Sequence, residues 1–255
     1  MLPAEVVHYR DCLREARYAA LADAEGFEAI CFAIESLGLR LLGEQGTLER
    51  YKRRIADRAQ RSPALTTLAK SHPSRLKSFE ALYKSVQAAR NDAMHIGAYA
   101  RHATEAAIEL CIGLEEALMA DVDRTVGNVM ITTPVTVQPW QPIAYARQLM
   151  LMHSFSFLPV RIGESWWQIS ELGLAKFLSV NSDMKKWRLG QTIASAKDAG
   201  MEMVRLDKDD LLRASMTIDA VLQRAQVQRG PLLWLVIDEG HPEHLAGVLS
   251  PFELM

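Results

Sequence analysis

The segment 129–160, VMITTPVTVQPWQPIAYARQLMLMHSFSFLPV, sets the architecture expected for the C-terminal half of the chain. It contains two short runs of β-branched or aromatic residues, VTVQ and FLPV, with prolines around them and the helix-like IAYARQLMLMHS between them. Short runs of this composition bounded by proline are typical of strands. The segment therefore predicts a strand, a helix and a second strand, which is the beginning of an α/β unit.

The same order of elements, continued by a further strand and helix, recurs closer to the C-terminus. An internal repeat of this kind predicts two pseudo-symmetric α/β copies. The second copy is longer, with an insertion around RLDKDDLLRASM (205–216). The matching segments are VGNVM (126–130) with LGQTI (189–193), IAYARQLM (143–150) with IDAVLQRA (218–225), and WWQISELGLAKFL (166–178) with LAGVLSPFELM (245–255).

The N-terminal half has the helical period instead. Apolar residues recur every three or four positions, and no stretch alternates as a strand would. Glycine, or serine beside proline, interrupts the helices at 43–46, 62–63 and 72–74. The predicted fold class is multidomain, an all-α helical bundle followed by an α/β pair. The expected ranges are 1–124 for the bundle and 125–255 for the pair, with a first copy at 126–185 and a second, degenerate copy at 186–255.

The composition is that of an ordinary globular protein, with a net charge of −2 and 49% hydrophobic residues in 255. No apolar run reaches the roughly 18 residues of a membrane span, and the N-terminus lacks the apolar region of a signal peptide. Cys12, Cys31 and Cys111 lie in apolar helical patterns, so we interpret them as reduced core thiols of a cytoplasmic protein. The histidines and acids show no metal-ligand spacing, and no metal or cofactor is expected to be required.

The stretch 51–90 carries ten lysines and arginines but only two acids. Such a local excess of positive charge attracts a polyanion, and nucleic acid is the usual candidate. The alternative is a solvated basic face without a ligand. The residues predicted to bind RNA are Lys52, Arg53, Arg54, Arg58 and Lys84.

This basic stretch leads into RNDAMHIGAYARH, residues 90–102, in which Arg90, Asn91 and His95 are candidate catalytic residues. On one ideal helix Asn91, His95, Tyr99 and His102 would share an arc of about 80°, and Arg90 would lie about 140° from His95. Either a helix begins near residue 90, or two copies of the motif meet across a symmetric interface. We interpret His102 and Tyr99 as structural.

The three candidates suit the cleavage of RNA without a metal. A histidine such as His95 can move the proton of the 2′-hydroxyl or of the leaving oxygen. The guanidinium of Arg90 can stabilise the charge that develops on phosphorus, and Asn91 can orient either group. The alternative is that His95 is a satisfied polar group and that Arg90 pairs with Asp92 or Glu80.

The C-terminal half closely resembles a CBS domain, in which M-x-x-x-P-x-T-V-x-P leads into a helix, and the repeat implies a CBS pair over 126–255. The family senses adenine nucleotides between its copies, with a serine or threonine and, three residues later, an aspartate holding the ribose. The first copy has Ser170 and Gly173 at these places, and the second has Ser250 and Glu253. The resemblance implies a nucleotide at Ser250 and Glu253; the alternative is a pair that serves only for dimerisation.

The segment 1–122 resembles a HEPN domain, whose ribonuclease members work as homodimers. The motif that carries the resemblance is an arginine, a polar residue directly after it, and a histidine four residues further on, here Arg90, Asn91 and His95. The resemblance implies a toxin-like RNA endonuclease in which two arginines and two histidines surround one phosphate. The combined hypothesis is a metal-independent RNA endonuclease gated by a nucleotide-sensing CBS pair. The alternative is a non-catalytic RNA-binding or dimeric scaffold protein with a regulatory CBS pair. The sequence identifies neither the RNA target nor an antitoxin partner.

Overall fold

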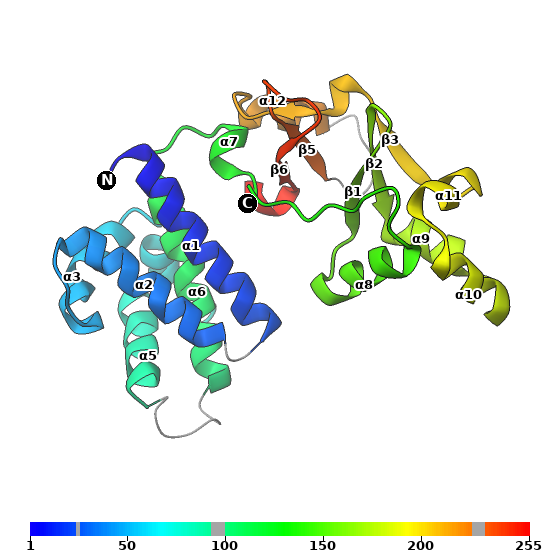
Figure 1. Cartoon of the computed structure of the whole chain (residues 1–255). Helices are drawn as coiled ribbons and strands as arrows, with labels where there is room; N and C mark the ends of the chain where they lie inside the picture. The colour runs from blue at the N-terminus through cyan, green and yellow to red at the C-terminus, as the bar shows by residue number, and fades with distance from the viewer. Residues whose placement is uncertain (24–25, 93–99, 226–232) are drawn as a thin grey trace. The chain divides into compact units, whose positions relative to one another are not determined.

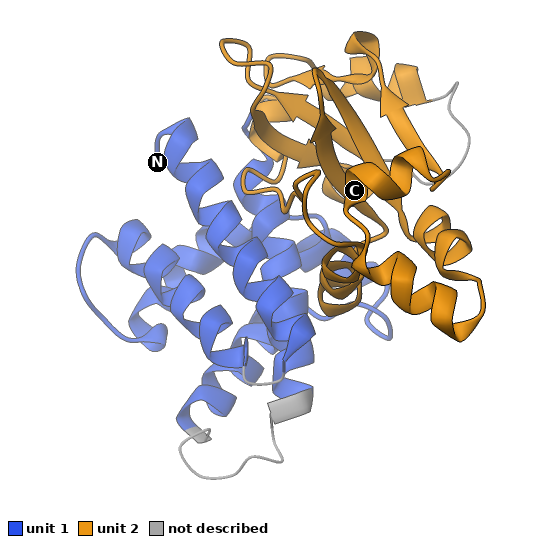
Figure 2. Ribbon diagram, turned by 45° about the vertical axis from the view of Figure 1, so that its right-hand side comes forward, with its two compact units in different colours: residues 1–122 blue, residues 123–255 orange. Residues whose placement is uncertain are grey.

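The computed structural model describes residues 1–23, 26–92, 100–225 and 233–255. Contacts divide the chain into two compact units, Met1–Val122 and Asp123–Met255 (Figure 2). The sequence placed the change of character close to this point, after residue 124. Among the described residues, no helix is long and apolar enough to cross a membrane.

All regular elements among the described residues of the first unit are helices (Figure 1). Helix α1 packs against α2 and α6, α5 packs against α6, and α3 packs against α2. The helices end where the sequence predicted breaks: α2 stops before Gly43, which has the positive φ of a helix C-terminus. The elements are α1 (Pro3–Ala22), α2 (Phe27–Leu42), α3 (Leu48–Ala59), the π-helical turn η2 (Ala64–Leu68), α4 (Ala69–Ser71), α5 (Phe79–Asp92) and α6 (Ala100–Met119).

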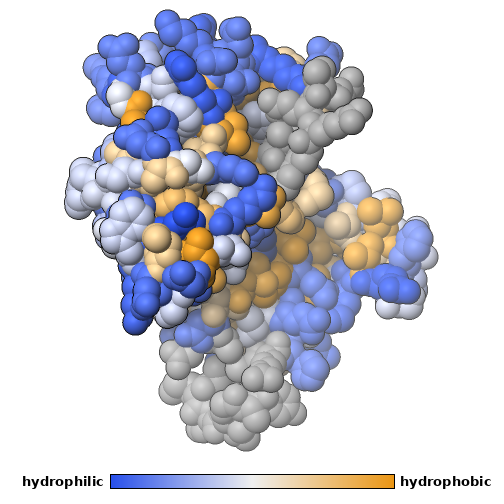
Figure 3. Space-filling model, turned by 90° about the vertical axis from the view of Figure 1, so that its right-hand side faces the viewer, coloured by the Kyte–Doolittle hydropathy of each residue, from blue (hydrophilic) through white to orange (hydrophobic). Residues whose placement is uncertain are grey.

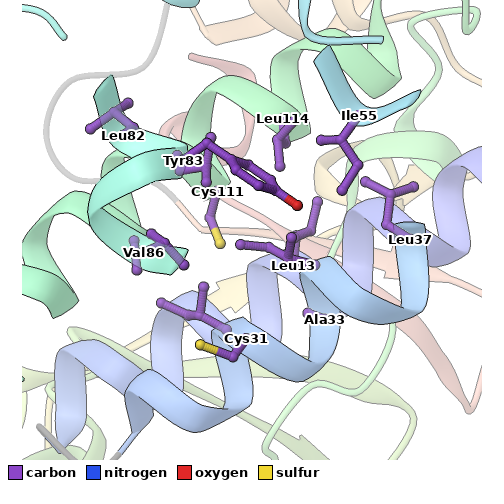
Figure 4. Close-up of a cluster of buried hydrophobic side chains, with 14 of the residues drawn as sticks. Leu13, Cys31, Ala33, Leu37, Ile55, Leu82, Tyr83, Val86, Cys111 and Leu114 are labelled. Carbon is purple, nitrogen blue, oxygen red and sulfur yellow. The ribbon is translucent and has the colours of Figure 1, made fainter. Parts of the chain in front are cut away.

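The core of this unit is built from side chains of α1, α2, α3, α5 and α6 (Figure 4). Tyr83 is buried there and donates its hydroxyl hydrogen to the carbonyl oxygen of Leu48 at 2.7 Å. Cys31 and Cys111 are buried free thiols, as predicted. Cys12, predicted as a core thiol, is only half-buried, with its Sγ 3.7 Å from Nε2 of His8.

The described residues of the motif at 90–102 belong to two helices. Residues 90–92 lie in α5, which is described up to Asp92, and residues 100–102 lie in α6, which is described from Ala100; these two helices pack against each other. The common arc expected for Asn91 and His102 is therefore wrong, because these residues lie on different helices. The alternative of a helix that begins near residue 90 is also wrong, because Arg90 lies in the last turn of α5.

The second unit contains two similar runs of elements, each with a helix, two strands and a final helical turn. The match of 143–150 with 218–225, and of 166–178 with 245–255, is confirmed. VTVQ is not a regular strand, because only Val137 pairs, in parallel with Val160. The first run is α8 (Ile143–His153), β1 (Phe157–Ile162), β2 (Ser165–Ser170) and α9 (Glu171–Leu178). The second is β4 (Leu212–Arg213), α12 (Ile218–Ala225), β5 (Trp234–Ile237), β6 (Leu245–Leu249) and the 3₁₀ turn η4 (Pro251–Leu254).

Each run is completed by a segment from elsewhere in the chain. The segment around α7 (Val126–Val129), at the start of the unit, pairs with the second run through Thr125 with Thr217 and Ile131 with Val248. The elements between the runs are α10 (Ser182–Gly190), α11 (Ile193–Asp198), β3 (Met203–Leu206) and η3 (Lys208–Asp210). Of these, β3 pairs with β2 of the first run, so the two sheets have the orders β1-β2-β3 and β4-β5-β6.

This exchange corrects one predicted match. Thr192 forms a bridge with Pro142, the residue directly before α8. In the second copy, Thr125 forms the corresponding bridge with Thr217, the residue directly before α12. The counterpart of Val126 is therefore Ile193, and not Leu189 as the sequence comparison proposed. The sequence comparison aligned glycines, whereas the structure aligns the threonines that precede α7 and α11.

Candidate functional site

Arg90 is held by an acid of another helix. Its Nη2 lies 2.6 Å from Oε1 of Glu35 on α2, with the arginine side chain 43% exposed and the glutamate side chain 23% exposed. Asp92 and Glu80 were the partners predicted from the sequence, whereas the partner in the structure is Glu35. No local pattern joins residues 35 and 90, because their contact depends on the packing of α2 against α5.

The other two catalytic candidates are placed differently. Asn91 follows Arg90 in the last turn of α5 and is exposed. His95 lies outside the described residues, as does Tyr99. His102 is exposed near the start of α6. The structure thus brings Arg90 and Asn91 to one end of α5, and the place of His95 stays a prediction.

Three of the five residues predicted to bind RNA are exposed. Arg53 and Arg54 are exposed on α3, beside the half-buried Lys52, and Lys84 is exposed on α5. Tyr51 and Ile55, on the opposite face of α3, are buried in the core. The basic side chains therefore follow from the amphipathic pattern of α3, which turns its charged face away from the bundle.

Arg58 instead makes contacts within the protein, at the end of α6. Its Nη2 donates to the carbonyl oxygen of Leu118 at 2.9 Å, and its Nη1 lies 3.7 Å from Oδ2 of Asp121. Burial, together with the positive charge of Arg61, lowers the pKa of the Arg58 guanidinium. An arginine in this position satisfies a carbonyl group at the end of α6, where a cation is favourable.

Ser250 and Glu253 bind each other across the first turn of η4. The Ser250 hydroxyl donates to Oε2 of Glu253 at 2.7 Å, and the Ser250 backbone N–H donates to the same oxygen at 2.8 Å. The Ser250 oxygen in turn accepts a hydrogen bond from the N–H of Phe252. This is a capping box, for which S-x-x-E is the sequence signature. A ligand that uses both groups must replace these contacts.

The matching turn of the first copy has no room for an acidic side chain. Ser170 caps α9 by accepting a hydrogen bond from the N–H of Gly173 at 3.0 Å. A Cβ atom at Gly173 would lie 2.4 Å from the carbonyl oxygen of Glu202, just before β3. The backbone of the exchanged segment therefore occupies the space in which an aspartate would stand.

The second unit has a hollow of about 390 Å³ between α8 and α9. Apolar residues line most of it, and Arg147 and Glu171 contribute charges of opposite sign. It lies within the first copy, away from the capping box of η4. Nearby Leu151 and Leu172 are exposed. In the view from the side of α10, hydrophobic residues form separate patches among hydrophilic ones (Figure 3). Among the described residues, no group of three histidine, cysteine or acidic side chains could hold a metal ion.

No protein-family model matches the chain, and no curated protein matches it. Solved structures that contain CBS domains are similar to its C-terminal half. CBSX2 of Arabidopsis thaliana in complex with AMP is 16% identical over 51% of this chain and 92% of its own, with a TM-score of 0.38. The CBS domain pair of MJ0100 in complex with 5′-methylthioadenosine and S-adenosyl-L-methionine is 16% identical over 51% of this chain and 91% of its own, with a TM-score of 0.37.

A hemolysin-like protein containing a CBS domain, from Oenococcus oeni PSU, is 19% identical over 52% of this chain and 88% of its own, with a TM-score of 0.36. The residues of the second unit themselves show two similar α/β runs, each completed by an exchanged segment.

Proposed function

We propose that this chain is a metal-independent RNA endonuclease with a HEPN-like helical unit, gated by a nucleotide-sensing CBS-like pair. The observation that carries the proposal is the position of Arg90, together with its ion pair and its exposure to solvent. It lies in the last turn of α5 at the start of the R-N-x₃-H motif, and it is held by Glu35 while 43% of its side chain is exposed. An arginine that is both held and accessible suits the binding of a phosphate.

The chemistry needs a proton handler and a fixed positive charge. His95 would take the proton of the 2′-hydroxyl or supply one to the leaving 5′-oxygen. Arg90 would stabilise the charge on the phosphorane, and Asn91 would orient the phosphate or the histidine. Two chains are expected to form a homodimer in which the second copy of the motif completes the site.

The basic residues beyond the motif would hold the RNA. The exposed Arg53, Arg54 and Lys84, and the half-buried Lys52, offer positive charge to phosphates without selecting a base sequence. Arg58 contributes less, because the end of α6 already uses its guanidinium. We therefore propose Lys52, Arg53, Arg54 and Lys84 as the main RNA contacts.

The gate would act through the connection between the units. The backbone of residues 124–127, shortly after α6, is hydrogen-bonded to that of residues 214–218 in the second copy. Arg124 also donates to the carbonyl oxygen of Leu254 at 3.0 Å, in the turn that Ser250 caps. A ligand that rearranges this turn would thereby displace the residues that leave α6, provided that it binds one arrangement better than the other.

The proposed ligand is an adenine nucleotide whose ribose hydroxyls replace the contact between Ser250 and Glu253. Both side chains can accept hydrogen bonds from the ribose. AMP in CBSX2, and 5′-methylthioadenosine and S-adenosyl-L-methionine in MJ0100, belong to the same chemical class. At most one nucleotide per chain is expected, because Gly173 leaves the first copy without an acid.

A second candidate is a non-catalytic RNA-binding or scaffold protein with the same regulatory pair. The ion pair of Arg90 with Glu35 favours it, because the contact also joins α2 to α5 and so has a use without catalysis. In that case the basic side chains of α3 would bind RNA, and Arg90 would only support the bundle.

Incubation of the purified protein with RNA and a metal chelator separates the two candidates. The endonuclease is expected to release fragments with cyclic phosphate ends, and light scattering should show a dimer. Arg90→Ala and His95→Ala should each lower the cleavage rate by about 10²-fold or more, while His102→Ala should have a small effect. RNA that is bound but stays intact would support the non-catalytic candidate.

A further inference from the structure

Glu35 approaches Arg90 from the flank of α2. The two neighbours of Glu35 on the core side, Ile34 and Leu37, are fully buried, and the carboxylate lies at the edge of the core with 23% exposure. Its Oε1 lies 2.6 Å from Nη2 of Arg90, which is the distance of a close ion pair. An arginine has five N–H donors, more than the two oxygens of one carboxylate engage in a bidentate pair, so donors remain to receive a phosphate.

Two further observations concern the surroundings of Arg90. Cys31 lies one turn before Glu35 on α2; burial raises the pKa of its thiol to about 12, and the charge of Arg90 opposes that rise. One turn earlier on α5, Gln87 donates to Oε2 of Glu49 at 2.7 Å, which joins α5 to α3. The end of α5 is thus joined to α3 through Gln87 and Glu49 and to α2 through Arg90 and Glu35.

We propose that Glu35 is a positioning residue that presents Arg90 to the scissile phosphate. This inference rests on the proposed endonuclease function. Without the carboxylate, the long side chain in the last turn of α5 would sample many rotamers, and few of them would meet the phosphate in the transition state. The carboxylate also keeps the guanidinium from binding RNA in unproductive places. Its effect is therefore on the rate of cleavage more than on the affinity for RNA.

The chain offers a matched control. Glu5 of α1 pairs with Arg40 of α2 at 2.8 Å, with side-chain exposures of 31% and 43%. This pair joins two helices of the same bundle, as Glu35 and Arg90 do, but it does not include a residue of the motif. Because exposed ion pairs contribute little stability, Glu35→Ala should lower the melting temperature by a small amount. Glu5→Ala should lower it at least as much, because Glu5 also accepts a hydrogen bond from the Leu2 backbone N–H at the start of α1.

Single-turnover cleavage of a labelled RNA in a metal chelator is the test. Glu35→Ala should lower the maximal rate about tenfold with little change in the RNA concentration for half-saturation, and Glu35→Gln, which keeps a hydrogen-bond acceptor, should recover part of the rate. Glu5→Ala should cleave as the wild type does. In the Arg90→Ala background, Glu35→Ala should have no further effect, because the glutamate acts through the arginine.

The outcomes separate this inference from the proposed function. If Arg90→Ala loses cleavage while Glu35→Ala keeps the wild-type rate, the endonuclease stands and the positioning role is overturned. A faster rate in Glu35→Gln would also overturn it, since the carboxylate would then be an inhibitor. If the wild-type protein cleaves no RNA, the proposed function fails, and the positioning role fails with it.

Discussion

Replacement of Glu253 by alanine is expected to abolish the rise in melting temperature that an adenine nucleotide causes in the wild type. The carboxylate accepts hydrogen bonds from the Ser250 hydroxyl and backbone N–H, at 2.7 and 2.8 Å, so the substitution also removes the glutamate half of the capping box of η4. Loss of such a cap costs about 1 kcal/mol, which corresponds to a fall of about 4 °C in the melting temperature of a unit of this size.

The ligand effect should be larger than the cap effect. A nucleotide at a hundred times its dissociation constant stabilises the fold by about 2.7 kcal/mol. Thermal unfolding of the wild type with and without millimolar AMP, ADP or ATP should therefore show a shift that exceeds the loss of the cap. Glu253→Ala should unfold at a lower temperature and show no shift with nucleotide.

Ser170→Ala is the matched control. Ser170 caps α9 in the first copy by accepting a hydrogen bond from Gly173, so its loss has a similar cost without touching the proposed ligand site. This variant should unfold earlier but keep the full nucleotide shift. If Glu253→Ala keeps the shift, or Ser170→Ala loses it, the assignment of the nucleotide to the second copy is wrong. No shift in the wild type would leave the pair as a dimerisation element.

Three further predictions concern the described residues. Gly173→Asp should not create a nucleotide site but should destabilise the protein by at least about 1–3 kcal/mol in urea titration, because its Cβ would lie 2.4 Å from the Glu202 carbonyl oxygen. Arg58→Ala should lower the melting temperature more than Arg53→Ala, and Arg53→Ala should weaken RNA binding more, as filter binding at fixed salt can show. Burial raises the pKa of the Cys31 thiol to about 12. The stability that the neutral thiol contributes is complete below the ordinary thiol pKa and is lost as the pH rises towards 12. Between pH 8 and pH 10.5, Cys31→Ala should therefore lose less stability than the wild type in urea titration.

Local patterns predicted the helical character of the first unit and most elements of the two α/β copies, but they wrongly predicted a strand at VTVQ. The helical period predicted the bundle, and glycine or proline predicted its breaks, because these depend on residues within one or two turns. The repeat of IAYARQLM as IDAVLQRA likewise predicted α8 and α12. The segments that cross between the copies were not predicted, because a short strand such as β3 carries no mark of the sheet that it joins.

In the candidate site, too, local features could be predicted from the sequence, whereas contacts between distant residues could not. The S-x-x-E of Ser250 and Glu253 carried a local capping signature that the ribose hypothesis passed over. The role of Arg58 at the end of α6, and that of Glu35 beside Arg90, arise from contacts between helices that are distant in sequence. One ideal helix was the wrong premise for residues 90–102, because residues 90–92 belong to α5 and residues 100–102 belong to α6.

The rate of RNA cleavage in the presence of a metal chelator, measured with and without an adenine nucleotide, tests gated cleavage most directly. The wild-type protein is expected to cleave without metal at a rate that changes when the nucleotide is added, and Glu253→Ala should cleave at a rate that the nucleotide does not alter. Intact RNA under all conditions would contradict the endonuclease. Cleavage at the same rate with and without nucleotide, in a protein that binds the nucleotide, would contradict the gate.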